Sequence, residues 1–245
     1  MDLDVVFLGT AASVPSASRG LSSMLIRRGG ERLLIDCGEG TQRQLMRSTG
    51  LSEIDCVLIT HLHADHVLGL PGMLKTFGLR ERSEPLRVVG PRGLERFWND
   101  MSRVVGRLPY EVDVLQLEDG IAWHGDGYVV EAVPTNHGIP SIGYLLDEDD
   151  RPGRFDVEAA RALGVTPGED FGVLQRGGDV TLADGSVVQS HQVVGEHRYG
   201  RRVVYTGDTT ATSSIRDAAR DATLLVHEAT FLQEDAERAR STHHA

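Results

Sequence analysis

Three histidines and one aspartate lie within the six residues from 61 to 66. They are His61, His63, Asp65 and His66, and they directly follow an apolar run that is typical of a strand. Imidazole and carboxylate groups without a thiolate indicate a catalytic zinc or manganese site rather than a structural zinc site. We therefore predict that His61 and His63 bind one divalent ion, whereas Asp65 and His66 turn toward a second ion.

Two further residues could complete this metal site from distant parts of the chain. His137 follows the predicted strand 128–133, and Asp208 follows the predicted strand 203–206. Open α/β sheets gather ligands at the carboxyl ends of their strands. We expect His137 to bind the first ion and Asp208 to bridge the two ions with one carboxylate oxygen each.

Two adjacent divalent ions define the chemistry that such a site would perform. At a separation of about 3.5–4 Å they lower the pKa of a bridging water and stabilise negative charge that develops on a phosphoryl or acyl oxygen. Asp65 is a candidate general base, and His227, at the end of another predicted strand, is a candidate acid for the leaving oxygen. The metal residues alone do not distinguish whether the substrate is a phosphodiester, a sulfate ester or a thioester.

Short apolar runs alternate with helical patterns along the chain, and four of the runs end in an acid or a histidine. These end residues are Asp36, His61, Asp208 and His227. Strands interleaved with helices indicate an α/β fold in which buried sheets are packed between helices. The sequence therefore predicts a fold that brings polar side chains together at strand ends.

The composition restricts what else the chain can be. Its 245 residues are 40% hydrophobic and carry a net charge of −11, which disfavours a general nucleic-acid binder because phosphate contacts require Lys and Arg. Residues 79–107 nevertheless contain seven arginines against four acids, so this stretch is either a phosphate-binding surface or a compositional bias. No apolar run approaches about 18 residues, which predicts no membrane span. Cys37 and Cys56 lie in apolar runs without redox spacing, so we expect reduced, buried thiols and a cytoplasmic location.

Several sequence boxes along the chain are distinctive. The boxes are Phe7-Leu8-Gly9-Thr10, Leu34-Ile35-Asp36-Cys37-Gly38-Glu39-Gly40-Thr41-Gln42-Arg43-Gln44, Asn136-His137, Tyr205-Thr206-Gly207-Asp208-Thr209 and His227-Glu228-Ala229-Thr230-Phe231. In these boxes and in the metal residues, the chain resembles the short form of the ribonuclease Z family, a tRNA 3′-processing endoribonuclease of the metallo-β-lactamase superfamily. The resemblance implies a four-layer αββα fold, with two mixed β-sheets sandwiched between helices, and a homodimer.

The resemblance also implies roles for the site residues. The implied ligands of one zinc are His61, His63 and His137, and those of the other are Asp65, His66 and a bridging Asp208. Asp65 is the base, and His227 assists the leaving 3′ oxygen. The implied reaction is zinc-dependent hydrolysis, with manganese as an alternative ion, of the phosphodiester at the 3′ side of precursor tRNA to leave a 3′-hydroxyl.

Residues 147–178 form an excursion that opens with four acids and continues with Arg151 and Arg154. Composition alone favours a solvated surface loop. The resemblance instead implies the protruding arm of the family, inserted within a single domain spanning residues 1–245, which grips tRNA away from the cut. Arg151 and Arg154 are the candidate substrate-binding residues of this arm.

The resemblance reaches the last residues, where His244 stands at the start of a segment that the family continues with a helix and a strand. That strand carries the last histidine ligand of the second zinc. We therefore expect the fold to lack its last helix and strand, the domain to be incomplete at the C-terminus, and the second zinc to be weakly held. Two alternatives remain open: another hydrolase of this fold, such as a phosphodiesterase, arylsulfatase or thioesterase, and an inactive tRNA-binding remnant.

Overall fold

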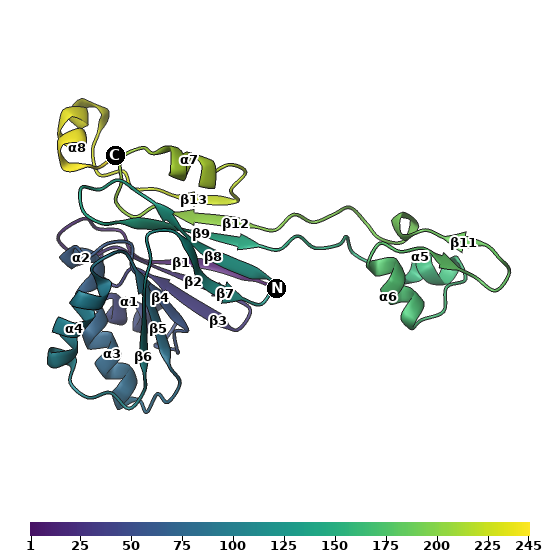
Figure 1. Ribbon diagram of the computed structural model, residues 1–245, viewed down its shortest axis with the longest axis horizontal. Coiled ribbons are helices and arrows are strands. Elements are labelled where there is room, and N and C mark those ends of the chain that lie inside the picture. The colour runs from purple at the N-terminus through teal and green to yellow at the C-terminus, as the bar shows by residue number, and fades with distance from the viewer. The chain divides into compact units, whose positions relative to one another are not determined.

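The computed structural model describes all 245 residues and divides them into two compact units (Figure 1). Unit 1 contains Met1–Asp147 and Arg202–Ala245, and unit 2 contains Glu148–Arg201. None of the helices combines the length and the apolar composition that crossing a bilayer requires.

The first sheet of unit 1 has six strands. In spatial order they are β1 (Leu3–Gly9), β2 (Ser23–Arg28), β3 (Glu31–Ile35), β4 (Cys56–Leu58), β5 (Leu86–Gly90) and β6 (Val112–Gln116). β1, β2 and β3 pair antiparallel, whereas β3 to β6 pair parallel. The sheet is therefore mixed, as the resemblance implies.

The second sheet of unit 1 has five strands, which come from later parts of the chain. In spatial order they are β13 (Leu224–Val226), β12 (Arg202–Tyr205), β9 (Ile142–Glu148), β8 (Tyr128–Pro134) and β7 (Gly120–Gly125). β12 pairs antiparallel with β9 and parallel with β13. This sheet therefore places the ends of β8 and β12, which are distant in sequence, near one another.

Side-chain alternation along the strands builds a core on each face of the first sheet. In β2, Met24 and Ile26 pack into the core between the two sheets, where they meet Tyr144 of β9. Leu25, between them, packs into a separate core with Phe77. Because successive side chains of a strand point to opposite faces, both faces of such a strand must be apolar and covered.

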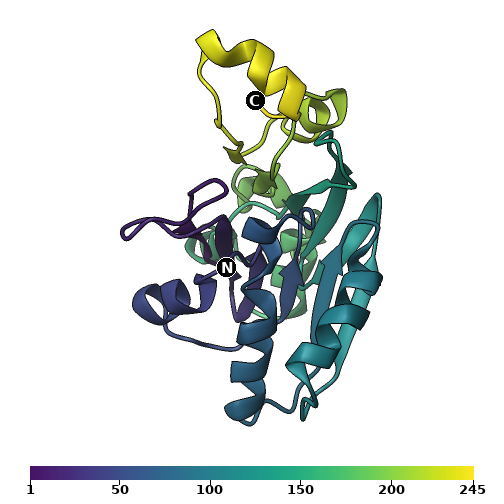
Figure 2. The same cartoon turned by 90° about the vertical axis from the view of Figure 1, so that its left-hand side faces the viewer.

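Helices cover the outer faces of both sheets (Figures 1 and 2). Helices α1 (Thr41–Ser48), α3 (Leu70–Leu79) and α4 (Leu94–Val105) bury apolar side chains against the first sheet. Helix α7 (Ser213–Ala218) buries Ile215 against the second sheet. The layer order is helix, sheet, sheet, helix, so the predicted αββα fold is confirmed.

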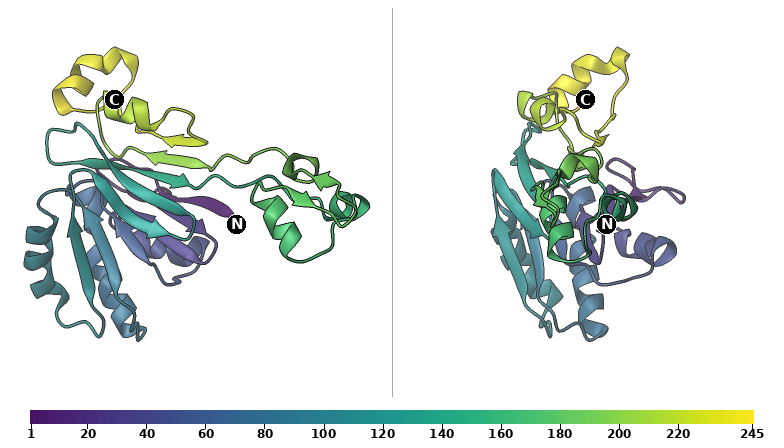
Figure 3. Two further views of the ribbon diagram at one scale, coloured as in Figure 1. Left: turned by 45° about the vertical axis from the view of Figure 1, so that its right-hand side comes forward. Right: turned by 90° about the vertical axis from the view of Figure 1, so that its right-hand side faces the viewer.

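The carboxyl ends of the strands carry the predicted polar residues. Asp36 follows β3 in a left-handed conformation with φ 57°. His61 follows β4 and forms an isolated β-bridge with Ser141, the residue that precedes β9. The short helix α2 (Ala64–Val67) begins within the metal loop, which we define as residues 61–66. Helix α8 (Ala236–Thr242) follows the 3₁₀ turn η2 (Gln233–Asp235) and lies on the same side of the second sheet as α7 (Figure 3).

Unit 2 has its own small core. Its elements are α5 (Val157–Ala162), α6 (Glu169–Gln175), β10 (Val180–Thr181), β11 (Val187–Val188) and the 3₁₀ turn η1 (Ser190–Gln192). Ala160 and Leu174 of the helices pack against Val180, Val188 and Val193.

The predicted boundary of the arm at residue 178 is therefore wrong, because the segment continues to Arg201. Its helices need the later valines to bury their apolar faces. The returning chain also pairs with the outgoing chain through the bridges Arg151↔Arg198 and Phe155↔Val194. Unit 2 is inserted between the two parts of unit 1, in the position where the resemblance implies an arm within a single domain.

Candidate metal centre

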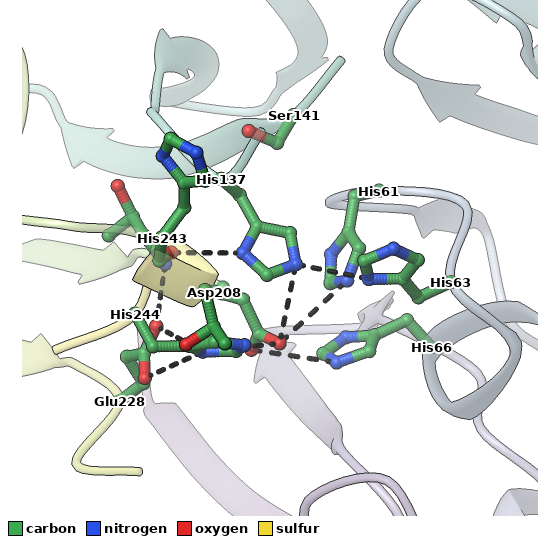
Figure 4. A network of polar contacts seen from close by, with 12 residues as sticks. His61, His63, His66, His137, Ser141, Asp208, Glu228, His243 and His244 are labelled. Carbon is green, nitrogen blue, oxygen red and sulfur yellow. Dashed lines mark hydrogen bonds and ion pairs between the residues drawn. The ribbon is translucent and has the colours of Figure 1, made fainter. Parts of the chain in front are cut away.

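Four histidines and one aspartate meet at the strand ends of unit 1 (Figure 4). His61 and His63 follow β4, His66 lies on α2, His137 follows β8, and Asp208 follows β12. His137 Nε2 lies 3.0 Å from His63 Nδ1. Two nitrogen ligands of a tetrahedral zinc ion, each at about 2.0–2.1 Å, would lie roughly 3.3 Å apart, so this spacing is close to that of a metal-ligand pair.

The carboxylate of Asp208 faces the histidines with both of its oxygens. Its Oδ2 lies 3.8 Å from the Nε2 atoms of both His61 and His137, whereas its Oδ1 lies 3.6 Å from His66 Nε2. The potential ligand atoms fall into overlapping groups, His61–His63–His137 and His61–His66–Asp208. A carboxylate with one oxygen toward each group has the arrangement expected of a bridging ligand.

Asp65 lies at the edge of this cluster. Its Oδ2 is 3.7 Å from His66 Nε2 and accepts a hydrogen bond from the backbone N–H of Ser13 at 2.8 Å. Asp65 is not part of the tightest groups of potential ligands. One carboxylate oxygen is thus held by the Ser13 loop, and the side chain stays next to His66.

A buried carboxylate orients two of the histidines. Asp36 accepts a hydrogen bond from His66 Nδ1 at 2.8 Å and from the Thr60 hydroxyl at 3.0 Å. Because the Thr60 proton points to Asp36, the Thr60 oxygen is free to accept from His61 Nδ1, which lies 3.0 Å away. Both rings are thereby turned so that Nε2 faces Asp208.

The residues fit a bound cation. His61 Nε2 is buried and has no hydrogen-bond partner, and a buried polar atom without a partner is costly unless something binds it. Metal-binding histidines commonly donate their second ring nitrogen to a carboxylate or carbonyl, as His61 and His66 do here through Thr60 and Asp36. A divalent ion between the Nε2 atoms and Asp208 would satisfy the lone pair of His61.

The surroundings shift the pKa values of His61 and His66 in opposite directions. Burial, together with the neighbouring imidazoles, lowers the pKa of His61 to about 2, so this ring is neutral and available as a ligand. Burial acts in the same direction on His66, but the charge of Asp36 and the contact with Asp208 outweigh it and raise the pKa of His66 to about 10. In the metal-free chain His66 therefore holds a proton that a bound cation must displace.

Two site residues were missed at the sequence level. His244 Nδ1 lies 3.0 Å from both oxygens of Glu228 and 3.9 Å from Asp208 Oδ2, and His137, Asp208 and His244 form a third group of potential ligands. Glu228 stands in the His227–Phe231 box, and His244 was noted only for its position near the chain end. The sequence gives no sign that Glu228 pairs with His244, 16 residues later, because the turn that follows α8 brings the two together.

His227 and the two arginines of unit 2 belong to none of the groups of potential ligands. His227 is exposed and its Nδ1 lies 2.8 Å from the carbonyl oxygen of Glu228; it lines a cavity of about 400 Å³ that Asp208 also lines. Arg151 forms an ion pair with Glu148 at 3.4 Å. Arg154 lines a cavity of about 590 Å³ within unit 2.

A third cavity lies against the cluster. It has a volume of about 430 Å³ and is lined by the metal-loop residues His63 and Asp65, by Asp208, and by Arg238 and His244 of the C-terminal segment. Arg238 stacks over Phe231, with its guanidinium carbon 5.3 Å from the ring centroid. The cavity therefore combines a possible metal site with a cation on its wall.

This fold and site define a metal-binding hydrolase of the metallo-β-lactamase superfamily, whose family model matches residues 19–241. The chain is 48% identical to a ribonuclease Z of Haloferax volcanii over 100% of this chain and 78% of that protein. It is 45% identical to a ribonuclease Z of Myxococcus xanthus over 99% of this chain and 80% of that protein. The chain belongs to the ribonuclease Z family, and the prediction of an endoribonuclease of this type is confirmed.

Solved structures agree with the fold. Human tRNase Z, short form (ELAC1), is 28% identical and superposes with a TM-score of 0.69, covering 98% of this chain and 83% of that one. A metallo-β-lactamase fold protein, YhfI from Bacillus subtilis, is only 18% identical but superposes with a TM-score of 0.65 over 99% of this chain and 76% of that one. The second similarity supports the fold alone.

Proposed function

We propose that this chain is a zinc-dependent endoribonuclease that hydrolyses the phosphodiester at the 3′ side of precursor tRNA and leaves a 3′-hydroxyl. The observation that carries the proposal is the convergence of His61, His66 and His137 on the two oxygens of Asp208, with His63 next to His137. The ribonuclease Z relatives and the similarity to human tRNase Z support the substrate.

We propose two zinc ions, with manganese as an alternative, because the donor set contains only imidazole and carboxylate. His61, His63 and His137 would hold one ion, and Asp65 and His66 the other, with Asp208 between them. Bound there, the ions would supply a water of lowered pKa and positive charge facing the phosphate. Asp65, whose Oδ2 is held by the Ser13 N–H, would accept the proton of that water.

The leaving 3′ oxygen needs a proton, and two histidines are candidates for its donor. His227 shares a cavity with Asp208. His244 lines the cavity that Asp65 and Asp208 also line, and the two oxygens of Glu228 would stabilise its protonated ring. The geometry favours His244, and single substitutions of the two histidines would separate them.

Positive charge near the cut and in unit 2 would bind the RNA backbone. Arg238, on the wall of the cavity at the cluster, would contact a phosphate next to the cut. Arg154 of unit 2, which lines a cavity of its own, would contact tRNA away from the cut, whereas Arg151 is already paired with Glu148. Unit 2 would thus contribute to affinity rather than to chemistry.

We also propose a homodimer and a cytoplasmic location. Large apolar side chains are exposed on the outer helices and the loops beside them, including Met46, Leu68 and Leu79 at 61%, 52% and 77% exposure, and a second copy would cover them. Cys37 and Cys56 are free and buried, in keeping with a reducing compartment.

The test is cleavage of a 3′-extended precursor tRNA in the presence of zinc or manganese. A single cut that leaves a 3′-hydroxyl is expected, together with its loss when Asp65 is replaced by alanine. Aryl phosphodiester, aryl sulfate and thioester substrates should react far more slowly. If one of these small esters turned over rapidly while the tRNA precursor stayed uncut, the result would support another hydrolase of this fold. If the chain bound tRNA but did not cleave it in the presence of either zinc or manganese, the result would support a binding remnant.

A further inference from the structure

The orientation of His137 depends on the turn that follows α8. Its Nδ1 lies 3.1 Å from the backbone carbonyl oxygen of His243 (Figure 4). A carbonyl oxygen can only accept a hydrogen bond, so Nδ1 must carry the proton and Nε2 must present a lone pair. This Nε2 is the atom that faces His63 and Asp208.

We infer that the backbone carbonyl of His243 is the positioning group of His137, which fixes the tautomer and the ring direction that a metal ion requires. The inference rests on the metal centre proposed above. It assigns this role to the peptide group of residue 243, and its imidazole is not part of the role. None of the groups of potential ligands includes the His243 ring.

A left-handed turn directs this carbonyl toward His137. His243 follows α8 with φ 57° and ψ 45°, a conformation that is uncommon for residues other than glycine, although asparagine, aspartate and histidine adopt it more often than the rest. The His244 N–H donates to the Ala239 carbonyl at 2.9 Å and closes the helix end. A strained residue of this kind needs support from its surroundings.

Ala245, two residues after His243, supplies that support. The Ala245 carbonyl accepts hydrogen bonds from the backbone N–H groups of Thr230 at 3.0 Å and Phe231 at 3.2 Å. The turn is thus tied to α8 on one side and to the segment after β13 on the other. Both anchors are backbone hydrogen bonds, so the position of the His243 carbonyl does not depend on any single side chain.

The loop that carries His137 is shaped to receive this turn. Gly138 has φ 82°, and a Cβ at this position would lie 2.9 Å from His243 Cδ2. Glycine therefore serves both the backbone conformation and the close approach of the two segments. Asp36 orients His66 directly and His61 through Thr60, whereas the second ring nitrogen of His137 is held by the His243 carbonyl instead.

The experiment compares two substitutions in the full chain. Valine disfavours the left-handed turn because it is β-branched, whereas asparagine tolerates it. His243→Val should weaken zinc binding about 10- to 100-fold, the range typical for losing a partner of a metal-ligating histidine. His243→Asn, which also removes the imidazole, should bind zinc about as tightly as the unaltered chain. Zinc affinity is measured by competition with a chelator, without RNA, and thermal unfolding of the metal-free chains confirms that both variants fold.

A second measurement needs neither zinc nor a variant. Long-range ¹H–¹⁵N spectra of the metal-free chain report which nitrogen of His137 is protonated, and Nδ1 is expected. A proton on Nε2 would overturn the inference, as would equal zinc affinity of the valine and asparagine variants. If the unaltered chain bound no zinc while His137 kept its Nδ1 proton, the proposed metal centre would fail and the positioning contact would stand.

Discussion

The metal centre has two sides that the chain builds in different ways. The Asp36 side comprises Asp36, Thr60, His61 and His66, which are all buried and lie within about 30 residues of sequence. The chain-end side comprises His137, Glu228, His243 and His244, which come from three separate segments, and His243 is exposed. The Asp36 side is oriented by a carboxylate within the core, whereas the chain-end side is oriented by a peptide group in a turn near the surface.

This difference predicts different consequences of damage. Removing a polar group from the core leaves its partners buried and unpaired, which costs stability as well as function. A change at the chain-end side is expected to alter metal binding and catalysis with less effect on folding, because water can reach the exposed groups. The predictions below test that division, from the largest expected effect to the smallest.

Replacing Asp208, the residue shared by both sides, should have the largest effect. Asp208→Ala removes the only carboxylate that faces His61, His66 and His137 together, so tRNA cleavage should fall by on the order of 10³-fold or more. Bound zinc, measured by elemental analysis, should fall with it. Asp217→Ala, at an exposed aspartate of α7, is the control and should change neither.

On the chain-end side, His244→Ala should lower kcat by about 10²–10⁴-fold, the usual contribution of a general acid. The free energy of unfolding should change little, because His244 is only partly buried. His227→Ala is the matched comparison. A larger kcat loss for His227 than for His244 would assign the leaving-group proton to His227.

On the Asp36 side, Asp36→Ala should lower the free energy of unfolding by about 3–5 kcal/mol. The substitution leaves the His66 ring, the Thr60 N–H and the Thr60 hydroxyl buried without their hydrogen-bond partner. Urea unfolding of the metal-free chain measures the loss. Asp36→Asn keeps one acceptor oxygen and should cost less. A stability loss for Asp36→Ala no greater than that for His244→Ala would contradict the division into two sides.

Arg238→Ala should raise KM for precursor tRNA about tenfold, the effect of losing one hydrogen bond to a charged group, and leave kcat nearly unchanged. Arg240→Ala, at an exposed arginine of the same helix that does not line the cavity, is the control. Equal KM values for the two variants would remove Arg238 from the RNA-binding surface.

The smallest effect is expected at the cysteines. Burial raises the pKa of the Cys37 and Cys56 thiols far above the usual range, so neither should react with a thiol reagent in the native chain at neutral pH. Cys37 directly follows Asp36 and therefore reports water entry on that side. Its modification rate should rise in Asp36→Ala and stay unchanged in His244→Ala.

The sequence alone predicted the layered fold and the residues that meet at Asp208. The strands β2, β3, β4 and β12 each contain a run of three apolar residues because both of their faces are covered, and such runs are easy to recognise. β6 and β7 carry no comparable signal, since these strands at sheet edges are only partly buried and lack such a run. The end of unit 2 was placed too early because β10 and β11 have two residues each.

The residue types and their order thus determined which side chains could bind metal, because imidazole and carboxylate ligands after buried strands have few other uses. Only the tertiary structure decided which ring nitrogen of each histidine faces the centre. That choice depends on hydrogen bonds from Asp36, Thr60 and the His243 carbonyl. A backbone carbonyl is present in every residue and leaves no signal in the sequence, so its role at His137 became visible only once the turn after α8 was located in space.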